Sequence, residues 1–332
     1  MIYKYLPYTS ILKVQNDEIL LKENHNRWVM FPIEHDTFWI LYKEVENNFW
    51  AAEDFIFTDD IKLLYQLPKP IFNTLLNLLS FHINLDNKLI CRPVDITLDL
   101  LSEVQIAEAR AFYGFQLTDE NIHTETISSM FQLFNQQLDT NIVSSNTLFL
   151  SSYGMDKIIW LYNECENNKC FFKRVLLLVI MKLLFYCSIN ILRDYLLKEK
   201  LLPTFITAFD SITNDRIIHT RFAHCTFRLL QNKMLESEVL EIIKQALKLE
   251  YQFILQYFTI QFFNLSTNVI KSYLEWIGNN ILLVCGYKTL YTSEFDIDWL
   301  NHPIIDLNIQ KQTNKIQKHN ENLNDIKFDE DF

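Results

Sequence analysis

The chain has 332 residues, of which 49% are hydrophobic, and it contains only 4 glycines and 7 prolines. Sandwiches, barrels and Rossmann domains need far more glycine in their turns and phosphate loops, so this composition predicts long helices. The net charge of −11 argues against a nucleic-acid backbone as the main partner, because polyphosphates attract basic surfaces.

Helical periodicity continues almost without interruption through the sequence. The predicted helices, in chain order, span residues 17–24, 36–48, 68–90, 96–134, 147–167, 171–198, 203–232, 236–263 and 268–285. No internal repeat and no linker rich in Gly, Pro or Ser interrupts this pattern, so we expect one all-α domain over residues 1–300. Residues 301–332 turn polar and rich in Asn and Lys, and they are predicted to form a flexible tail.

The most apolar run, "VLLLVIMKLLFYCSINIL" at residues 175–192, contains a single charge, Lys182. A lysine at the centre of a membrane span would cost about 3 kcal/mol on insertion scales. We therefore expect a buried helix of a helical bundle and no membrane contact. The six cysteines are scattered without a Cys-x-x-Cys pair, and residues 1–20 lack a signal-peptide pattern. A reduced, cytoplasmic setting fits these features best.

The stretch "ENIHTE" places Glu120 and His123 three residues apart, on one face of one helix. Ferritin-like bundles offer a carboxylate and an imidazole to a shared metal with this Glu-x-x-His spacing. A single match is a weak signal, because the same pair arises often as a surface glutamate and a buried histidine.

Three longer stretches strengthen this interpretation: "EVQIAEARAFYGFQLTDENIHTE" at 103–125, "RWVMFPIEHDTFWILYKEVENNFWAAED" at 27–54 and "NDRIIHTRFA" at 214–223. Together they closely resemble the small, radical-generating subunit of class I ribonucleotide reductase. The resemblance implies a ferritin-like helical fold, usually dimeric. It also implies a dinuclear iron or manganese centre that oxidises a nearby tyrosine, whose radical passes to a large catalytic subunit.

The resemblance implies that only part of the metal site remains. Glu120, His123 and His219 match ligand positions of the family. The resemblance assigns three other ligand positions to Ile56, Lys182 and Arg216. The position of the radical tyrosine is Ile127.

Two cations would therefore stand where carboxylates bind metal. We expect Lys182 and Arg216 to form a salt-bridged cluster with Glu120 that leaves no bound cofactor, because buried cations must be paired. One alternative is a single metal ion held by Glu120, His123 and His219. Another is a metal-free radical on Tyr113 or a different tyrosine.

Trp39 in "FWILYK", Asp215 and His123 match the family's radical relay. Such a hydrogen-bonded set also stabilises a fold by itself, so its presence does not establish electron transfer. Family members carry a redox tyrosine in the tail, whereas no tyrosine follows Tyr291 here. Export of a radical along the usual path is therefore expected to fail.

The end of the tail, "IKFDEDF", resembles the family peptide that docks onto the large subunit. The resemblance implies apolar anchors at Ile326, Phe328 and Phe332, and charges at Asp329 and Asp331. A short segment that folds onto an apolar groove would explain the two phenylalanines.

Three functions follow. The first, which we favour, is a small subunit without a radical that acts as a structural partner of an active small subunit, or of its own copy, and of the large subunit. The second is an autonomous radical subunit with an unusual metal site. The third is a regulatory binder that competes for the large subunit.

Overall fold

The computed structural model describes residues 3–88, 92–135, 152–166, 170–292, 297–300 and 305–307. The helices are α1 (Tyr8–Val14), α2 (Asp36–Asn47), α3 (Thr58–Leu64), α4 (Lys69–Lys88), α5 (Pro93–Glu103), α6 (Ala107–Asn135), α7 (Ser152–Glu166), α8 (Phe171–Leu183), α9 (Cys187–Glu199), α10 (Pro203–Leu229), α11 (Glu236–Tyr257) and α12 (Thr267–Cys285). Two short parallel strands, β1 (Lys4–Leu6) and β2 (Asn232–Met234), pair with Lys4 opposite Asn232. The predicted all-α class is confirmed.

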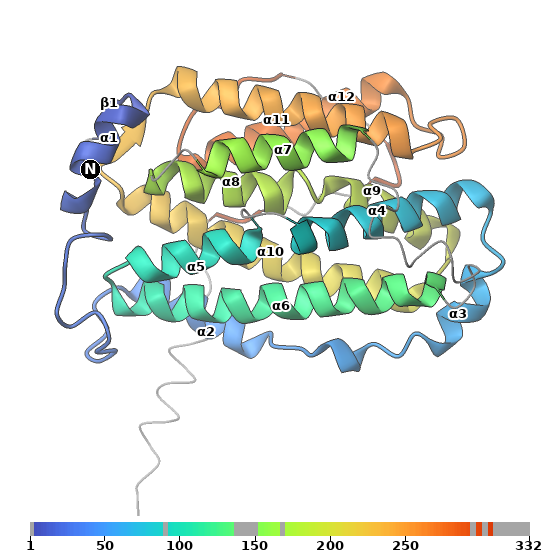
Figure 1. Cartoon of the computed structure of the whole chain (residues 1–332), viewed down its shortest axis with the longest axis horizontal. Coiled ribbons are helices and arrows are strands. Elements are labelled where there is room, and N and C mark those ends of the chain that lie inside the picture. Colours follow the sequence, from blue (N-terminus) through green and yellow to red (C-terminus); the bar gives the residue numbers. More distant parts are fainter. Residues whose placement is uncertain are drawn as a thin grey trace, which may run out of the picture.

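The long helices form a bundle around an extended apolar core (Figure 1). Helix α6 packs against α2, α4, α5 and α10, and α10 in turn packs against α8, α9 and α12. Helices α7, α11 and α12 lie together on the side of the bundle opposite α2 and α3 (Figure 1). Side chains of α6, α8 and α10 therefore meet in the interior.

Three of the expected helices differ from the structure. Residues 17–24 are not an α-helix, and only the 3-10 turn Gln15–Asp17 forms there. The expected helix at 96–134 is two helices, because Val104 adopts an extended conformation between α5 and α6. The expected helix at 171–198 ends at Leu183 and resumes at Cys187. Apolar periodicity does not show such short breaks, because side chains on both sides of them are buried.

The break after α8 lies directly beside Lys182. The amide of Phe185 donates to the carbonyl of Ile180 at 3.1 Å, which widens the last turn. Lys182 is thus in the final turn of α8, where the partial negative charge of the helix C-terminus favours a cation. Local backbone geometry therefore offsets part of the cost of burying this ammonium group.

Within the part of the protein that the structure describes, one helical stretch, Phe171–Glu199, is long and apolar enough to cross a membrane. In the fold, 89% of its most apolar window is buried among other helices. This burial favours the expected core helix, since a lipid-facing span would not need such cover.

The last described residues and the described cysteines complete the picture of the core. Ile305, Asp306 and Leu307 are described, and Leu307 packs against the core, so ordered contacts extend slightly beyond residue 300. Cys165 is disulfide-bonded, whereas Cys170, Cys187, Cys225 and Cys285 are free and buried.

Candidate functional site

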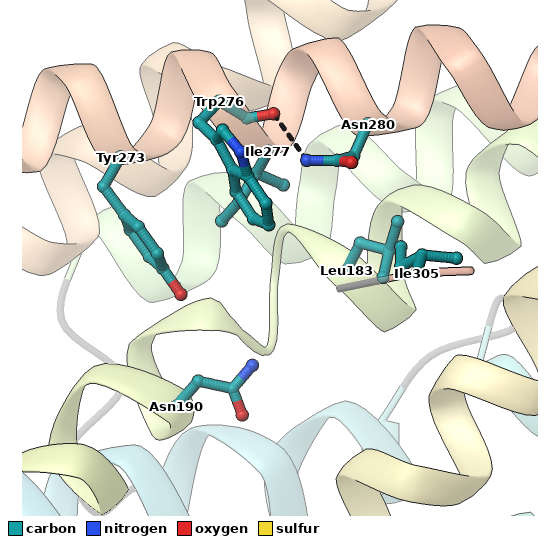
Figure 2. A pocket seen from close by; sticks show the side chains of 7 residues that line it. All are labelled: Leu183, Asn190, Tyr273, Trp276, Ile277, Asn280 and Ile305. Atoms are coloured by element: carbon teal, nitrogen blue, oxygen red, sulfur yellow. Dashed lines mark hydrogen bonds between the residues drawn. The ribbon is translucent and has the colours of Figure 1, made fainter. Parts of the chain in front are cut away.

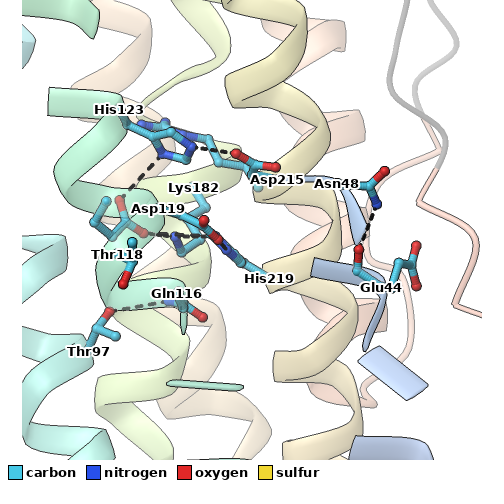
Figure 3. A network of polar contacts seen from close by, with 12 residues as sticks. Glu44, Asn48, Thr97, Gln116, Thr118, Asp119, His123, Lys182, Asp215 and His219 are labelled. Carbon is cyan, nitrogen blue, oxygen red and sulfur yellow. Dashed lines mark hydrogen bonds and ion pairs between the residues drawn. The ribbon is translucent and has the colours of Figure 1, made fainter. Parts of the chain in front are cut away.

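Six ionisable side chains meet inside the bundle, and we call them the buried charged cluster (Figure 3). They are Asp119, Glu120 and His123 from α6, Lys182 from α8, and Asp215 and His219 from α10. Each is at most 4% exposed. Ionisable groups this deeply buried are stable only when they satisfy one another, so their contacts determine what the site can do.

Lys182 connects the three helices of the cluster. Its ammonium group forms an ion pair with Glu120 Oε1 and donates a hydrogen bond of 2.9 Å to Nδ1 of His219. The expected pairing of Lys182 with Glu120 is present. The lysine thereby occupies one carboxylate oxygen and one imidazole nitrogen that a metal ion would otherwise need.

The tautomer of His219 follows from this contact. An ammonium group only donates, so Nδ1 of His219 accepts and the ring proton lies on Nε2. Nε2 lies 2.9 Å from Oδ2 of Asp119, to which it donates. Burial and the positive charge of Lys182 hold the pKa of His219 well below its ordinary value, so the ring is neutral.

Glu120 is ionised despite its position in the interior. Burial alone would raise its pKa, but Lys182 and then His123 outweigh this effect and hold the pKa well below its ordinary value. Oε2 of Glu120 lies 3.9 Å from Nδ1 of His123 and Oε1 lies 3.9 Å from Nδ1 of His219. The carboxylate therefore forms the negative centre of the cluster.

A second set of contacts extends from His123 toward the surface. Nε2 of His123 lies 2.8 Å from Oδ2 of Asp215, and Nε1 of Trp50 donates to the same oxygen at 2.9 Å. The rings of Trp50 and His123 stack at 5.7 Å with an interplanar angle of 18°. Burial acts to lower the pKa of His123, but Asp215 and Glu120 raise it above the ordinary value. Trp50 and His123 thus both hydrogen-bond to Asp215, and their rings stack on each other.

The tryptophan of the relay was predicted wrongly. Trp39 lies in the first half of α2, where its ring contacts Phe31 and Tyr42, and it makes no contact with Asp215. Trp50 takes the expected place instead. The signal was present in the sequence, since Trp50 opens the Trp-x-x-Glu stretch "WAAED".

One replaced-ligand assignment and one expected contact also need correction. Ile56 is 73% exposed and lies outside the cluster, and an exposed apolar side chain cannot replace a ligand of a buried site. Arg216 is buried, but it does not pair with Glu120. Its guanidinium lies 3.6 Å from the ring centroid of Tyr186, and among the described residues it forms no ion pair. A cation–π contact therefore replaces the expected salt bridge.

The position of the radical tyrosine is apolar. Ile127 is buried in the core. Tyr113, the alternative radical carrier, is also buried and packs edge-on against Phe222 at 5.0 Å. Burial raises its pKa above the ordinary value, so the phenol stays protonated. The docking residues Ile326, Phe328, Asp329, Asp331 and Phe332 lie outside the described residues.

The donor set does not fit a dinuclear metal centre. Among the described residues, no group of three His, Cys, Asp or Glu side chains is placed to hold a metal ion. Glu120 and His219 Nδ1 face the ammonium of Lys182, and His219 Nε2 carries a proton. An incoming divalent cation would have to displace a buried positive charge at contact distance. A single ion at Glu120, His123 and His219 meets the same obstacle.

Replacing Trp50 by phenylalanine tests whether the hydrogen bonds among Trp50, Asp215 and His123 stabilise the fold. The variant keeps an aromatic ring beside His123 but removes the donor to Asp215, so we expect a loss of about 1–2 kcal/mol in the free energy of unfolding. Trp39→Phe is the matched control, since Trp39 donates to no cluster residue, and its loss should stay below about 0.5 kcal/mol. Equal losses in urea denaturation would contradict the assignment of Trp50.

Comparisons with known proteins agree with the geometry of the bundle. A family model described as "Ribonucleotide reductase, small chain" matches residues 27–298. A small subunit of ribonucleoside-diphosphate reductase from Arabidopsis thaliana is 25% identical over 304 residues, which cover 92% of this protein and 87% of the relative. The human subunit M2 is 27% identical over 303 residues, which cover 91% of this protein and 76% of the relative.

Solved structures share the fold. The Rnr4 homodimer of ribonucleotide reductase from Saccharomyces cerevisiae superposes with a TM-score of 0.78 at 24% identity, covering 93% of this protein and 96% of that one. The dimanganese(II)-NrdF of Streptococcus sanguinis gives 0.66 at 18% identity, covering 83% and 96%. The expected ferritin-like bundle is thus confirmed, and with the family model matching most of its length, the chain belongs to the ribonucleotide reductase small-chain family.

Proposed function

We propose that this protein is a structural small subunit of ribonucleoside-diphosphate reductase, which pairs with an active small subunit and with the large subunit and makes no radical of its own. The observation that carries the proposal is the contact of Lys182 with both Glu120 and His219 Nδ1. It gives the cluster a positive charge of its own in place of a metal ion. The protein then binds no cofactor and serves deoxyribonucleotide synthesis in the cytoplasm through assembly.

Two further features support this assignment. Ile127 stands at the position that the resemblance gives to the radical tyrosine, and an aliphatic side chain cannot be oxidised to a stable radical. The set of Trp50, Asp215 and His123 joins the loop after α2 to α6 and α10. In a subunit without an oxidant, this set serves to stabilise the fold.

The tail supplies the contact with the large subunit in this proposal. Phe328 and Phe332 act as anchors together with Ile326, and Asp329 and Asp331 add charge. Replacing Phe328 and Phe332 by alanine should weaken binding to the large subunit and leave pairing between small subunits unchanged, because pairing uses the folded body.

Co-purification with an active small subunit tests the assembly role. A tagged copy of this protein, co-expressed with a small subunit that has the full ligand set, should recover that subunit in equal amount. Its addition to the reconstituted reductase should then raise turnover or leave it unchanged. Recovery of the tagged protein by itself, with turnover when the large subunit is its only partner, would contradict the proposal. A fall in turnover with loss of the active subunit from the complex would favour the regulatory binder.

A further inference from the structure

An apolar groove with a basic rim lies between α11 and α12, two helices that contribute no side chain to the buried charged cluster. Its volume is about 280 Å³. The floor and wall consist of Leu247, Tyr251, Leu274 and Tyr291, and the rim consists of Lys244, Lys248, Lys271 and Glu275.

Helix α12 holds the segment of Tyr291, which forms one wall of the groove. Oδ1 of Asn279 accepts hydrogen bonds of 3.0 Å from the amides of Leu290 and Tyr291, and its Nδ2 donates to the Tyr291 carbonyl at 2.8 Å. A Cβ at Gly278 would lie 3.1 Å from Leu247 Cδ1 and 3.3 Å from Tyr291 Cε2. Because Gly278 has no Cβ, Leu247 and Tyr291 can pack directly against α12. Specific contacts of the fold therefore form the groove.

The rim has the opposite charge to the protein as a whole. Three ammonium groups surround the apolar floor, whereas the protein carries a net charge of −11. Among the residues that line the groove only Glu275 opposes them, and it lies 3.8 Å from Lys271, whose side chain is 69% exposed. The groove therefore favours an acidic segment with large apolar side chains.

The protein itself contains such a segment. Residues 325–332, "DIKFDEDF", have four acidic side chains, one lysine and two phenylalanines. The last described residues pack against the same helix that forms one side of the groove: Ile305 lines a small cavity with Trp276 and Ile277 of α12 (Figure 2), and Leu274 of α12 lines the groove. The 17 residues between Leu307 and residue 325 could span about 50 Å when extended, so the segment can reach the groove.

We propose that residues 325–332 dock into the α11–α12 groove of their own chain. Phe328 or Phe332 inserts between Tyr251, Leu274 and Tyr291, and the acidic side chains face Lys244, Lys248 and Lys271. The docked segment is then withheld from other partners until one of them binds it more tightly. This inference does not rest on the absence of a radical, and it can fail while the proposed function holds.

Photo-crosslinking within the full-length protein tests the docking. The substitution Phe328→p-benzoylphenylalanine places a reactive ketone in the segment, and mass spectrometry identifies the attached peptides after irradiation. We expect crosslinks within one chain to residues 244–251 and 271–275. The triple variant Lys244→Glu, Lys248→Glu, Lys271→Glu should reduce their yield about tenfold, because each reversed exposed charge weakens binding a few-fold.

The matched control reverses three exposed lysines elsewhere on the protein: Lys13→Glu, Lys22→Glu, Lys62→Glu. It changes the net charge by the same amount and should leave the crosslink yield unchanged. Crosslinks spread over the surface, an equal loss in the control, or crosslinks only between two chains would each overturn docking within one chain. Circular dichroism of both triple variants verifies that they remain folded.

Discussion

Replacing Glu120 by alanine should lower the free energy of unfolding by about 3–5 kcal/mol, as measured by urea denaturation at pH 7. The variant removes the ion-pair partner of Lys182 and leaves the neutral imidazole of His219 as the hydrogen-bond partner of its buried ammonium group. An unpaired buried charge is far more costly than a lost surface contact. Glu46→Ala, which breaks the partly exposed pair with Lys43, should cost at most about 1 kcal/mol.

The double variant Glu120→Leu, Lys182→Met separates a stranded charge from lost packing. Both charges are then absent and the volume is kept, so the double variant should recover at least half of the loss seen for Glu120→Ala.

The stabilisation that Glu120 provides should also depend on pH. Because the pKa of Glu120 is depressed in the folded state, its stabilisation is present above the ordinary value of 4.5 and disappears as the pH falls through the lower folded value. The account of the cluster would be contradicted if Glu120→Ala lost no more stability than Glu46→Ala and if adding Lys182→Met did not change that loss.

Replacing Glu250 by alanine should be equally destabilising, by about 3–5 kcal/mol. Nζ of Lys157 lies 2.5 Å from Glu250 Oε2, and both side chains are 0% exposed. The ammonium also lies 3.7 Å from the ring centroid of Phe253 and 4.1 Å from that of Phe81. Burial lowers the pKa of Lys157 although Glu250 opposes this effect. This pair joins α7 to α11, so its loss should also speed hydrogen exchange in α7.

Two variants control this second prediction. Glu241→Ala lies on the exposed face of the same helix and should change stability by less than about 0.5 kcal/mol. Lys157→Met combined with Glu250→Leu removes both charges and should restore most of the stability. If Glu250→Ala and Glu241→Ala unfolded at the same urea concentration, the buried pair would not be a stabilising contact.

The sequence predicted the bundle because apolar periodicity records which helix faces are buried. It also predicted the unusual position of Lys182, since the helical neighbours of that lysine are all apolar or aromatic. The pair Glu120 and His123 was recognised from spacing within one helix. Contacts within one helix depend only on helix geometry, which is the same in every protein.

The failures concern segments whose position depends on tertiary packing. Ile56 and Trp50 lie in the irregular segment between α2 and α3, where no periodicity fixes which residue points inward, so Trp39 of the preceding helix was chosen instead of Trp50. Arg216 was placed on the correct helix, but its long side chain carries the guanidinium past the cluster to Tyr186. Lys157 and Glu250 are 93 residues apart, and no local sequence pattern predicts that their side chains form an ion pair.

Metal binding by the full-length protein tests the central claim that Lys182 has taken the place of the metal. Ferrous or manganous salt is added without oxygen, unbound metal is removed, and the protein is examined by mass spectrometry for metal content and, after exposure to air, by electron paramagnetic resonance. We predict no stoichiometric metal and no radical signal, because the ammonium group already holds Glu120 and His219. A dinuclear centre that disappears in His123→Ala and His219→Ala would contradict the account.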